Sequence, residues 1–287
     1  VLHSVQAEAR RQRLDVALKS CAPGRDSVLR CSQIGIGFSR EPAFQFELRE
    51  VPRITRVAVV IDDLGLNRAA ARELVRMHAA LTFSVMPRLR YSRETAEEAH
   101  RAGCEVMLHL PMQPLVDSAP DVSPDELRVG MPAAQVIGII TRDLASVPFA
   151  AGVNNHMGSR ATGNAPLMAS VMRTLAARHL FFIDSLTTPT SVALSVARQF
   201  QVASSYRSVF LDDTRTVPYT LAQLRLLCHL AGRRGAALAI GHPYPTTLKA
   251  LAQFLPQLQR ENIELVPASW LAGLPEASAR GDGGFGS

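Results

Sequence analysis

The chain has 287 residues, of which 47% are hydrophobic and 20% are charged, the composition of a soluble globular protein. No apolar run approaches the roughly 18 residues that a membrane-spanning helix needs, so we expect no transmembrane segment. The 31 basic and 25 acidic residues give a net charge of +6, and the basic residues form no stripe interleaved with aromatic ones. This pattern argues against nucleic-acid binding.

The four cysteines show no C-x-x-C spacing, which argues against a thiolate zinc site or a redox motif. Cys21 and Cys31 either form a disulfide, as in an exported protein, or remain free thiols. The first residues lack the basic and then apolar pattern of a signal peptide. Two alternatives stay open: a cytoplasmic protein, or a sequence that does not begin where the native precursor begins.

In chain order, residues 1–50 come first and have the pattern of an appendage. Within them, the arginine-rich residues 6–19 predict a helix, and residues 44–48 alternate apolar and polar side chains as an edge strand does. The sequence predicts the main domain over residues 51–274. The glycine-, serine- and alanine-rich residues 275–287 predict a disordered tail.

Within the main domain, apolar strand patterns alternate with helical patterns about every 25–30 residues. The predicted strands are residues 57–62, 81–86, 104–110, 148–154, 180–184, 207–211, 236–241 and 263–266. The predicted helices are residues 68–79, 92–102, 132–146, 165–178, 190–200, 219–234 and 246–260. This alternation implies parallel strands with right-handed crossovers. Seven or eight such units favour a (β/α) barrel, and an open doubly wound sheet remains the alternative.

Local signals refine this pattern at the helix starts and in one connection. Asn67, Ser92 and Thr246 are suited to cap the N-termini of three of the helices. Residues 113–130 form the one long irregular connection and are rich in proline. We expect this connection to be a functional surface loop beside the mouth of the barrel.

Polar side chains recur where the predicted strands end. In parallel sheets the carboxyl ends of the strands meet on one face, so residues far apart in sequence can share a site there. The residues at these ends are Asp62, Asp63, His109, His156, Asp184, Asp212, Asp213 and His242.

Each of these residues also has a purely structural explanation. Asp62 or Asp63 can cap the next helix, and a single histidine at a strand end can be a hydrogen-bonded packing residue. Asp212 followed by Asp213 is most simply a turn. Asp184 and the following serine lack a Gly-x-Ser-x-Gly elbow, which argues against a serine hydrolase. Because three histidines and an acidic pair occur at separate strand ends, we favour a functional site.

The residue types suit metal-assisted hydrolysis. One aspartate and two neutral imidazoles suit a divalent ion such as Zn²⁺, with a coordination position left open. A second carboxylate beside the ion can accept a proton from water, and a protonated histidine opposite can donate one to the leaving group. Together these parts predict a hydrolase of amides or esters.

The ordered motifs VVIDDLG (59–65), LHLPMQP (108–114), NNHMGSRAT (154–162), FFIDS (181–185), VFLDD (209–213) and AIGHPYPTTL (239–248) resemble the divergent polysaccharide deacetylase family. This family is a distant relative of the metal-dependent polysaccharide deacetylases, and the resemblance covers about residues 54–272. It implies a distorted (β/α) barrel and deacetylation of a polysaccharide. It also implies export, for example to the periplasm.

The resemblance further implies roles for individual residues. Asp62 would be the catalytic base, whereas Asp63 and His109 would be metal ligands. His242 would be the general acid.

The motifs also depart from the metal-dependent deacetylases. Gln113 stands where their H-x-x-x-H motif has its second histidine, and His156 is the candidate replacement ligand. Their Arg-x-Pro-Tyr motif is not recognisable, and we assign part of its orienting role to Asp184.

Three functions therefore remain from the sequence. The leading one is a metal-dependent hydrolase that removes N- or O-acetyl groups from a polysaccharide or oligosaccharide of the cell envelope. The alternative is a catalytically silent glycan-binding or scaffold protein with the same fold. A third is hydrolysis of a small amide or phosphate ester, although no phosphate-cradling glycine-rich loop is present. The sequence identifies no protein partner.

Overall fold

The computed structural model describes residues 55–116, 125–258 and 262–273 in full, together with the backbone of three strands nearer the N-terminus. The chain forms two units, residues 1–54 and 55–287. The three N-terminal strands make an antiparallel sheet in the order β1-β2-β3. They are β1 (Asp15–Ser20), β2 (Cys31–Phe38) and β3 (Glu41–Arg49).

The N-terminal unit corrects one prediction and agrees with another. Residues 15–19 were predicted as part of a helix but belong to β1, because they pair antiparallel with β2 and the sheet satisfies their backbone groups. Residues 44–48 lie in β3, an edge strand as predicted. The predicted disordered tail, residues 275–287, and residues 6–14 of the predicted helix lie outside the described residues.

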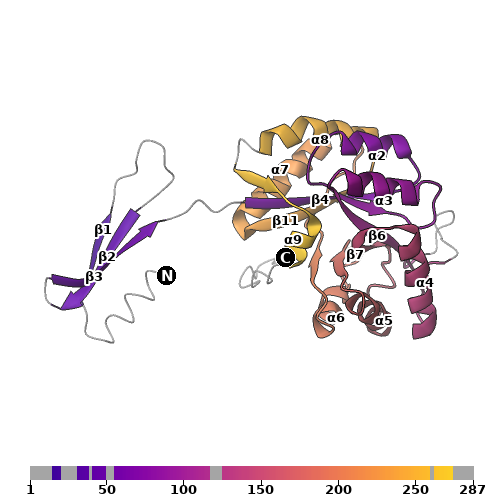
Figure 1. Ribbon diagram of the computed structural model, residues 1–287, viewed down its shortest axis with the longest axis horizontal. Coiled ribbons are helices and arrows are strands. Elements are labelled where there is room, and N and C mark those ends of the chain that lie inside the picture. The colour runs from indigo at the N-terminus through magenta and orange to yellow at the C-terminus, as the bar shows by residue number, and fades with distance from the viewer. Residues whose placement is uncertain are drawn as a thin grey trace, which may run out of the picture. The chain divides into compact units, whose positions relative to one another are not determined.

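The second unit contains a curled sheet in which all paired strands are parallel (Figure 1). Its order is β10-β11-β4-β5-β6-β7-β8-β9, and β12 pairs with β4 beside this path. The strands are β4 (Thr55–Leu64), β5 (Thr82–Val85), β6 (Glu105–Met112), β7 (Ala150–Met157), β8 (Phe181–Asp184), β9 (Ser204–Tyr206), β10 (Val209–Phe210), β11 (Ala236–Gly241) and β12 (Ile263–Leu265).

Helices alternate with these strands, and all but the last of those described pack around the outside of the sheet (Figure 1). They are α2 (Arg68–Val75), α3 (Ser92–Arg101), α4 (Ala133–Ser146), α5 (Ala165–Ala176), α6 (Ala193–Gln199), α7 (Val217–Arg234), α8 (Pro245–Leu258) and α9 (Ala268–Ala272). Every predicted strand and helix of the main domain is present, apart from differences at the ends. The short helix α9 was not predicted.

One of the three predicted helix caps is confirmed. The side chain of Asn67 accepts hydrogen bonds from Ala69 N–H and Ala70 N–H at the start of α2. Ser92 is instead the first residue of α3, and its hydroxyl donates to the carbonyl of Met86. Thr246 lies inside α8, which begins one residue earlier at Pro245 because proline is well suited to the first helical turn.

The sheet curls until its two edges nearly meet, which confirms the predicted distorted barrel. The predicted strand 207–211 corresponds to β10, which pairs with β11 at one edge, whereas β9, which was not predicted, pairs with β8 at the other edge. Only Arg207 and Ser208 separate β9 from β10 in the chain. The Cα atoms of Tyr206 and Val209 are three residues apart and can be separated by at most about 11 Å, so the two edges must approach closely.

Side chains inside the barrel form a core of their own, separate from the core under the outer helices. The inner core includes Ala58 and Val60 of β4, and α9 packs against it with Leu271. Two inward-facing groups satisfy the first backbone N–H groups of α9. Ala268 N–H donates to Thr82 Oγ1 at 3.0 Å, and Ser269 N–H donates to Glu105 Oε1 at 3.1 Å. Helix α9 therefore closes the barrel at the end opposite the carboxyl ends of the strands.

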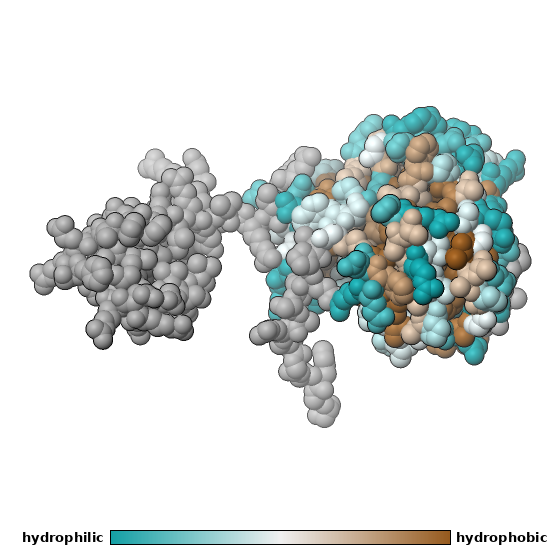
Figure 2. Space-filling model, turned by 60° about the horizontal axis from the view of Figure 1, so that its bottom comes forward, coloured by the Kyte–Doolittle hydropathy of each residue, from teal (hydrophilic) through white to brown (hydrophobic). Residues whose placement is uncertain are grey.

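The surface carries hydrophobic and hydrophilic side chains side by side on the face shown in Figure 2. Some large hydrophobic side chains are exposed near the carboxyl ends of strands, including Leu66 after β4 and Leu115 after β6. Among the described residues, no helix combines the length and apolar character that crossing a membrane requires.

Candidate metal centre

Alternation along the strands brings polar side chains together at the mouth of the barrel. Every second residue of a strand points to the same face. On β4 the inward-facing Ala58 and Val60 are therefore followed by Asp62. The polar side chains that meet on the inner face in this way are Asp62, Ser84, His109, Asn154, His156, Ser185 and His242.

A bulge at the end of β4 adds Asp63 to this group. A regular strand would send the adjacent Asp62 and Asp63 to opposite faces. Instead, the pairing of β4 with β5 shifts register between Ile61 and Leu64, and Asp63 has a left-handed backbone with φ 55°. Bulges of this kind re-aim side chains, and aspartate tolerates the left-handed region better than most residues. Both carboxylates therefore approach the same imidazole.

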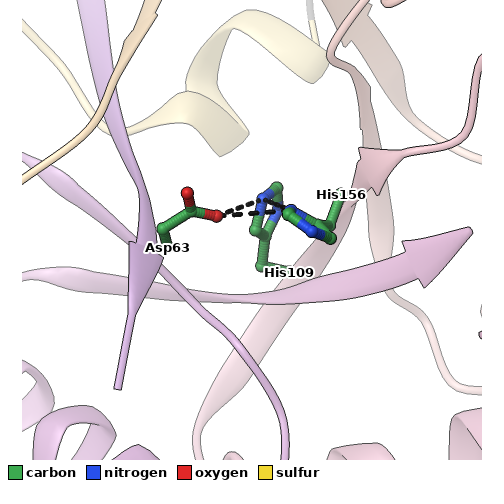
Figure 3. Close-up of side chains that lie close together, drawn as sticks. All are labelled: Asp63, His109 and His156. Atoms are coloured by element: carbon green, nitrogen blue, oxygen red, sulfur yellow. Dashed lines mark hydrogen bonds and ion pairs between the residues drawn. The ribbon is translucent and has the colours of Figure 1, made fainter. Parts of the chain in front are cut away.

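Asp63, His109 and His156 form a group that can hold a metal ion (Figure 3). Asp63 Oδ1 lies 3.3 Å from His109 Nε2 and 3.3 Å from His156 Nδ1, and the two nitrogens are 3.2 Å apart. One ligand atom from each residue fits within 4.8 Å of the others. Asp63 Oδ1 is buried and makes no protein hydrogen bond, as expected for an oxygen that can coordinate a cation. The residues present therefore fit a divalent ion.

Electrostatics at this group also favour a cation. Burial acts to raise the pKa of Asp63, but the imidazoles of His109 and His156 outweigh burial and hold the pKa well below its usual range. Burial acts to lower the pKa of His109, whereas Asp62 and Asp63 overcome it and raise the pKa to about 9. Asp63 is therefore ionised, and its negative charge attracts protons or a metal ion to the two imidazoles.

His242 lies across the mouth from these two histidines and has its own carboxylate partner. Its Nε2 is 3.7 Å from Asp63 Oδ2, and its Nδ1 is 2.9 Å from Asp212 Oδ1. Asp212 Oδ2 also accepts hydrogen bonds from His242 N–H at 2.6 Å and from Thr247 Oγ1 at 2.8 Å. Burial acts against a raised pKa of His242, but the hydrogen bond to Asp212 and the charges of Asp63 and Asp62 raise the pKa.

Asp212 is the functional candidate that the sequence analysis missed, since a turn explained the Asp-Asp pair equally well. One signal was available in the sequence, namely Gly241 immediately before His242. A Cβ at Gly241 would lie 3.0 Å from Leu211 Cβ and 3.2 Å from Asp212 Oδ2, so glycine is what allows this close approach. The neighbouring Asp213 is exposed.

The structure places Asp184 at the end of β8, and the orienting role assigned to it stays a prediction. Its carboxylate accepts hydrogen bonds from the Ser191 hydroxyl at 2.6 Å and from Leu186 N–H at 2.9 Å. Among the contacts of the described residues, none joins Asp184 to His242. Asp184 therefore holds the loop after β8. The carboxylate that contacts the His242 ring is Asp212.

Gln113 does not join the ligand group. Its Oε1 accepts a hydrogen bond from Val129 N–H at 3.0 Å, and its carbonyl accepts from Arg160 N–H and Ala161 N–H. Gln113 therefore fastens the two ends of its loop to each other and to the loop after β7. The middle of the predicted functional loop, residues 117–124, lies outside the described residues.

The fold and this arrangement of residues agree with a match to a known family. A model of the divergent polysaccharide deacetylases matches residues 59–272. The chain belongs to the divergent polysaccharide deacetylase family. The family predicted from the motifs is thus confirmed, and its match begins in β4 and ends in α9.

The chain is also similar to uncharacterized proteins of other organisms. It is 37% identical over 221 residues to the uncharacterized protein YibQ of Escherichia coli K12, covering 77% of this chain and 68% of YibQ. An uncharacterized protein of Haemophilus influenzae is 37% identical over 212 residues, covering 74% of this chain and 75% of that protein. The crystal structure of the uncharacterized protein ATU2773 from Agrobacterium tumefaciens C58 superposes with a TM-score of 0.73 at 26% identity, covering 77% of this chain and 91% of that chain.

Proposed function

We propose that the protein is a metal-dependent hydrolase that removes N- or O-acetyl groups from a polysaccharide of the cell envelope. The observation that carries the proposal is the arrangement of Asp63, His109 and His156 opposite the His242–Asp212 pair. The substrate class comes from the family, and the chemistry comes from the residues.

Zn²⁺ is the ion that suits one carboxylate and two imidazoles best. Asp63 would hold it through Oδ1, His109 through Nε2 and His156 through Nδ1, the atoms that already face one another. When bound, such an ion supplies a Lewis acid that polarises a carbonyl group and makes water more acidic.

The remaining side chains would move protons. Asp62 Oδ2 lies 3.6 Å from His109 Nε2, so this carboxylate stands beside the ligand group and can accept a proton from the attacking water. His242, with its Nδ1 held by Asp212, presents Nε2 toward the mouth and can donate a proton to the leaving amine or alcohol. Base and acid therefore occupy different sides of the ligand group.

Metal content tests the ligand group. Purified wild-type protein should hold about one divalent ion per chain, and His109→Ala and His156→Ala should each lose it. The exposed His229 on α7 provides a matched control, because His229→Ala removes an imidazole that is not part of the ligand group. Metal content that is unchanged in both ligand variants would refute the site.

Acetate release tests the reaction. Wild-type protein should release acetate from at least one of chitooligosaccharides, peptidoglycan and acetylated exopolysaccharide. Asp62→Asn should reduce turnover by about 10²-fold or more while the metal stays bound. Asp63→Ala should lose metal and turnover together. Glycan binding by the wild type without acetate release would instead support the glycan-binding scaffold.

A further inference from the structure

Asn154 is completely buried at the centre of the barrel mouth and uses all the hydrogen-bonding capacity of its amide. Its Oδ1 accepts from the Ser84 hydroxyl at 2.6 Å and lies 2.9 Å from His109 Nδ1. Its Nδ2 donates to Asp62 Oδ1 at 2.8 Å and to Ser185 Oγ at 3.3 Å. One amide therefore contacts both the proposed base and a proposed metal ligand, although it belongs to neither group.

The chemistry of these partners fixes which way the amide faces. An ionised carboxylate can only accept hydrogen bonds, so Asp62 requires the NH₂ end of Asn154. The carbonyl end must then face His109 Nδ1, and a carbonyl can only accept. When His109 is neutral, as a metal ligand must be, its proton is thereby required on Nδ1, which leaves the lone pair of Nε2 directed at Asp63 and His156.

We propose that Asn154 is a positioning residue that couples the base to the metal centre, because its two ends fix Asp62 and the tautomer of His109 at the same time. The inference rests on the proposed metal site. It assigns separate duties to the two halves of one side chain. The carbonyl prepares a metal ligand, and the NH₂ group holds the base.

The adjacent Asn155 shows what a structural asparagine does in the same strand. It is equally well buried, but its hydrogen bonds run to the main chain: it donates to the Met157 carbonyl at 2.8 Å and accepts from Ser185 N–H at 2.9 Å. Loss of Asn155 should therefore affect folding stability alone. This neighbour of the same type provides a matched control for Asn154.

Two substitutions separate the duties of Asn154. Asn154→Ala removes both ends, so the Kd for Zn²⁺ should rise by about 10–100-fold, as for other groups that orient metal-ligating histidines. Asn154→Asp keeps an acceptor for His109 Nδ1 but replaces the NH₂ donor to Asp62 with a second carboxyl group, which competes with Asp62 for a proton. Its Kd for Zn²⁺ should stay within about threefold of the wild-type value, whereas acetate release should fall by about 10²-fold. Asn155→Ala should lower the urea midpoint and leave the Kd for Zn²⁺ unchanged.

A measurement on the metal-free protein tests the hydrogen bond itself. The Nδ1–H proton of His109 should give a slowly exchanging, downfield NMR resonance in the wild type and in Asn154→Asp, and no such resonance in Asn154→Ala. Zn²⁺ binding by folded Asn154→Ala with the wild-type Kd would overturn the inference, and so would equal Kd values for the Ala and Asp variants. If the wild type binds Zn²⁺ but releases no acetate, the proposed deacetylation fails, and the Zn²⁺ and NMR comparisons still decide the role of Asn154.

Discussion

At the scale of single residues, Asp212 is the carboxylate partner of His242, the proposed general acid. Asp212 contacts both the ring and the main-chain N–H of His242, and Thr247 holds the same carboxylate from α8. A proton on Nδ1 that is directed at a carboxylate leaves Nε2 to exchange protons with a substrate. This arrangement fixes the imidazole ring through Nδ1 and leaves Nε2, the nitrogen proposed to donate the proton, directed at the mouth of the barrel.

Replacing Asp212 should therefore impair proton donation more than metal binding. We expect Asp212→Asn to lower kcat by about 10²-fold while the protein still holds one ion per chain. Acetate release and metal analysis on the same sample provide the measurement. Asp213→Asn is the matched control, because Asp213 is exposed and adjacent, and it should retain wild-type kcat. Similar losses in the two variants would show that Asp212 does not orient His242.

At the scale of secondary-structure elements, the close packing of β7 against β8 depends on a glycine, Gly152. Gly152 on β7 faces the ring of Phe181 on β8, and a Cβ at Gly152 would lie 2.4 Å from Phe181 Cζ. The ring belongs to the inner core and has little room to move. The strands that carry His156 and Asp184 are thus held together by a ring placed over a glycine.

Gly152→Ala should destabilise the barrel by about 1–3 kcal/mol, because the added methyl overpacks the inner core. Urea unfolding followed by circular dichroism measures this change. Gly138 on α4 is a suitable control, since a Cβ there would meet only Arg142 Nη1 at 3.9 Å. Gly138→Ala should stabilise the protein by about 0.5–1 kcal/mol through helix propensity. If Gly152→Ala also stabilised the protein, the added methyl group would not overpack the inner core.

Helix α4 carries a buried acid that the proposed mechanism does not use. Asp143 lies 2.9 Å from Arg88 Nε and has no exposed surface. Burial raises the pKa of Asp143 to about 6, although the charge of Arg88 opposes the change. Because the folded protein binds this proton more tightly than the unfolded chain does, the associated stability is present below about pH 4 and is lost as the pH rises through about 6.

Asp143→Asn should remove this pH dependence. We expect the variant to be more stable than the wild type by about 1–2 kcal/mol at pH 8 and by little at pH 4. Free energies of unfolding measured from pH 4 to 8 provide the test. A difference that stays constant across this range would show that Asp143 does not titrate with a raised pKa.

At the scale of the whole molecule, local patterns predicted the elements, and long-range contacts decided the rest. Alternating and helical periods depend on neighbouring residues, so the strands and helices of the barrel could be read from the sequence. The short strand β9 could not, because it depends on pairing with the edge strand β8 rather than on a local pattern. The N-terminal strand β1 was missed for the same reason, since its partner is β2.

The residues of the candidate site were likewise predicted from local patterns only in part. Position at a strand end identified Asp62, Asp63, His109, His156 and His242, and the structure brings these five together. Asp212 was predicted to lie in a turn, because its contact with His242 depends on how two distant loops meet. The bulge that turns Asp63 inward depends on the register between β4 and β5, which no local pattern specifies.

The most direct test is a crystal of the Zn²⁺-soaked protein measured at the zinc absorption edge. We predict one anomalous peak at the mouth of the barrel, coordinated by Asp63 Oδ1, His109 Nε2 and His156 Nδ1 at about 2.0–2.2 Å. The carboxylate of Asp62 should lie beside the ion without coordinating it. A barrel mouth without a peak, or an ion held by residues other than these three, would refute the proposed metal centre.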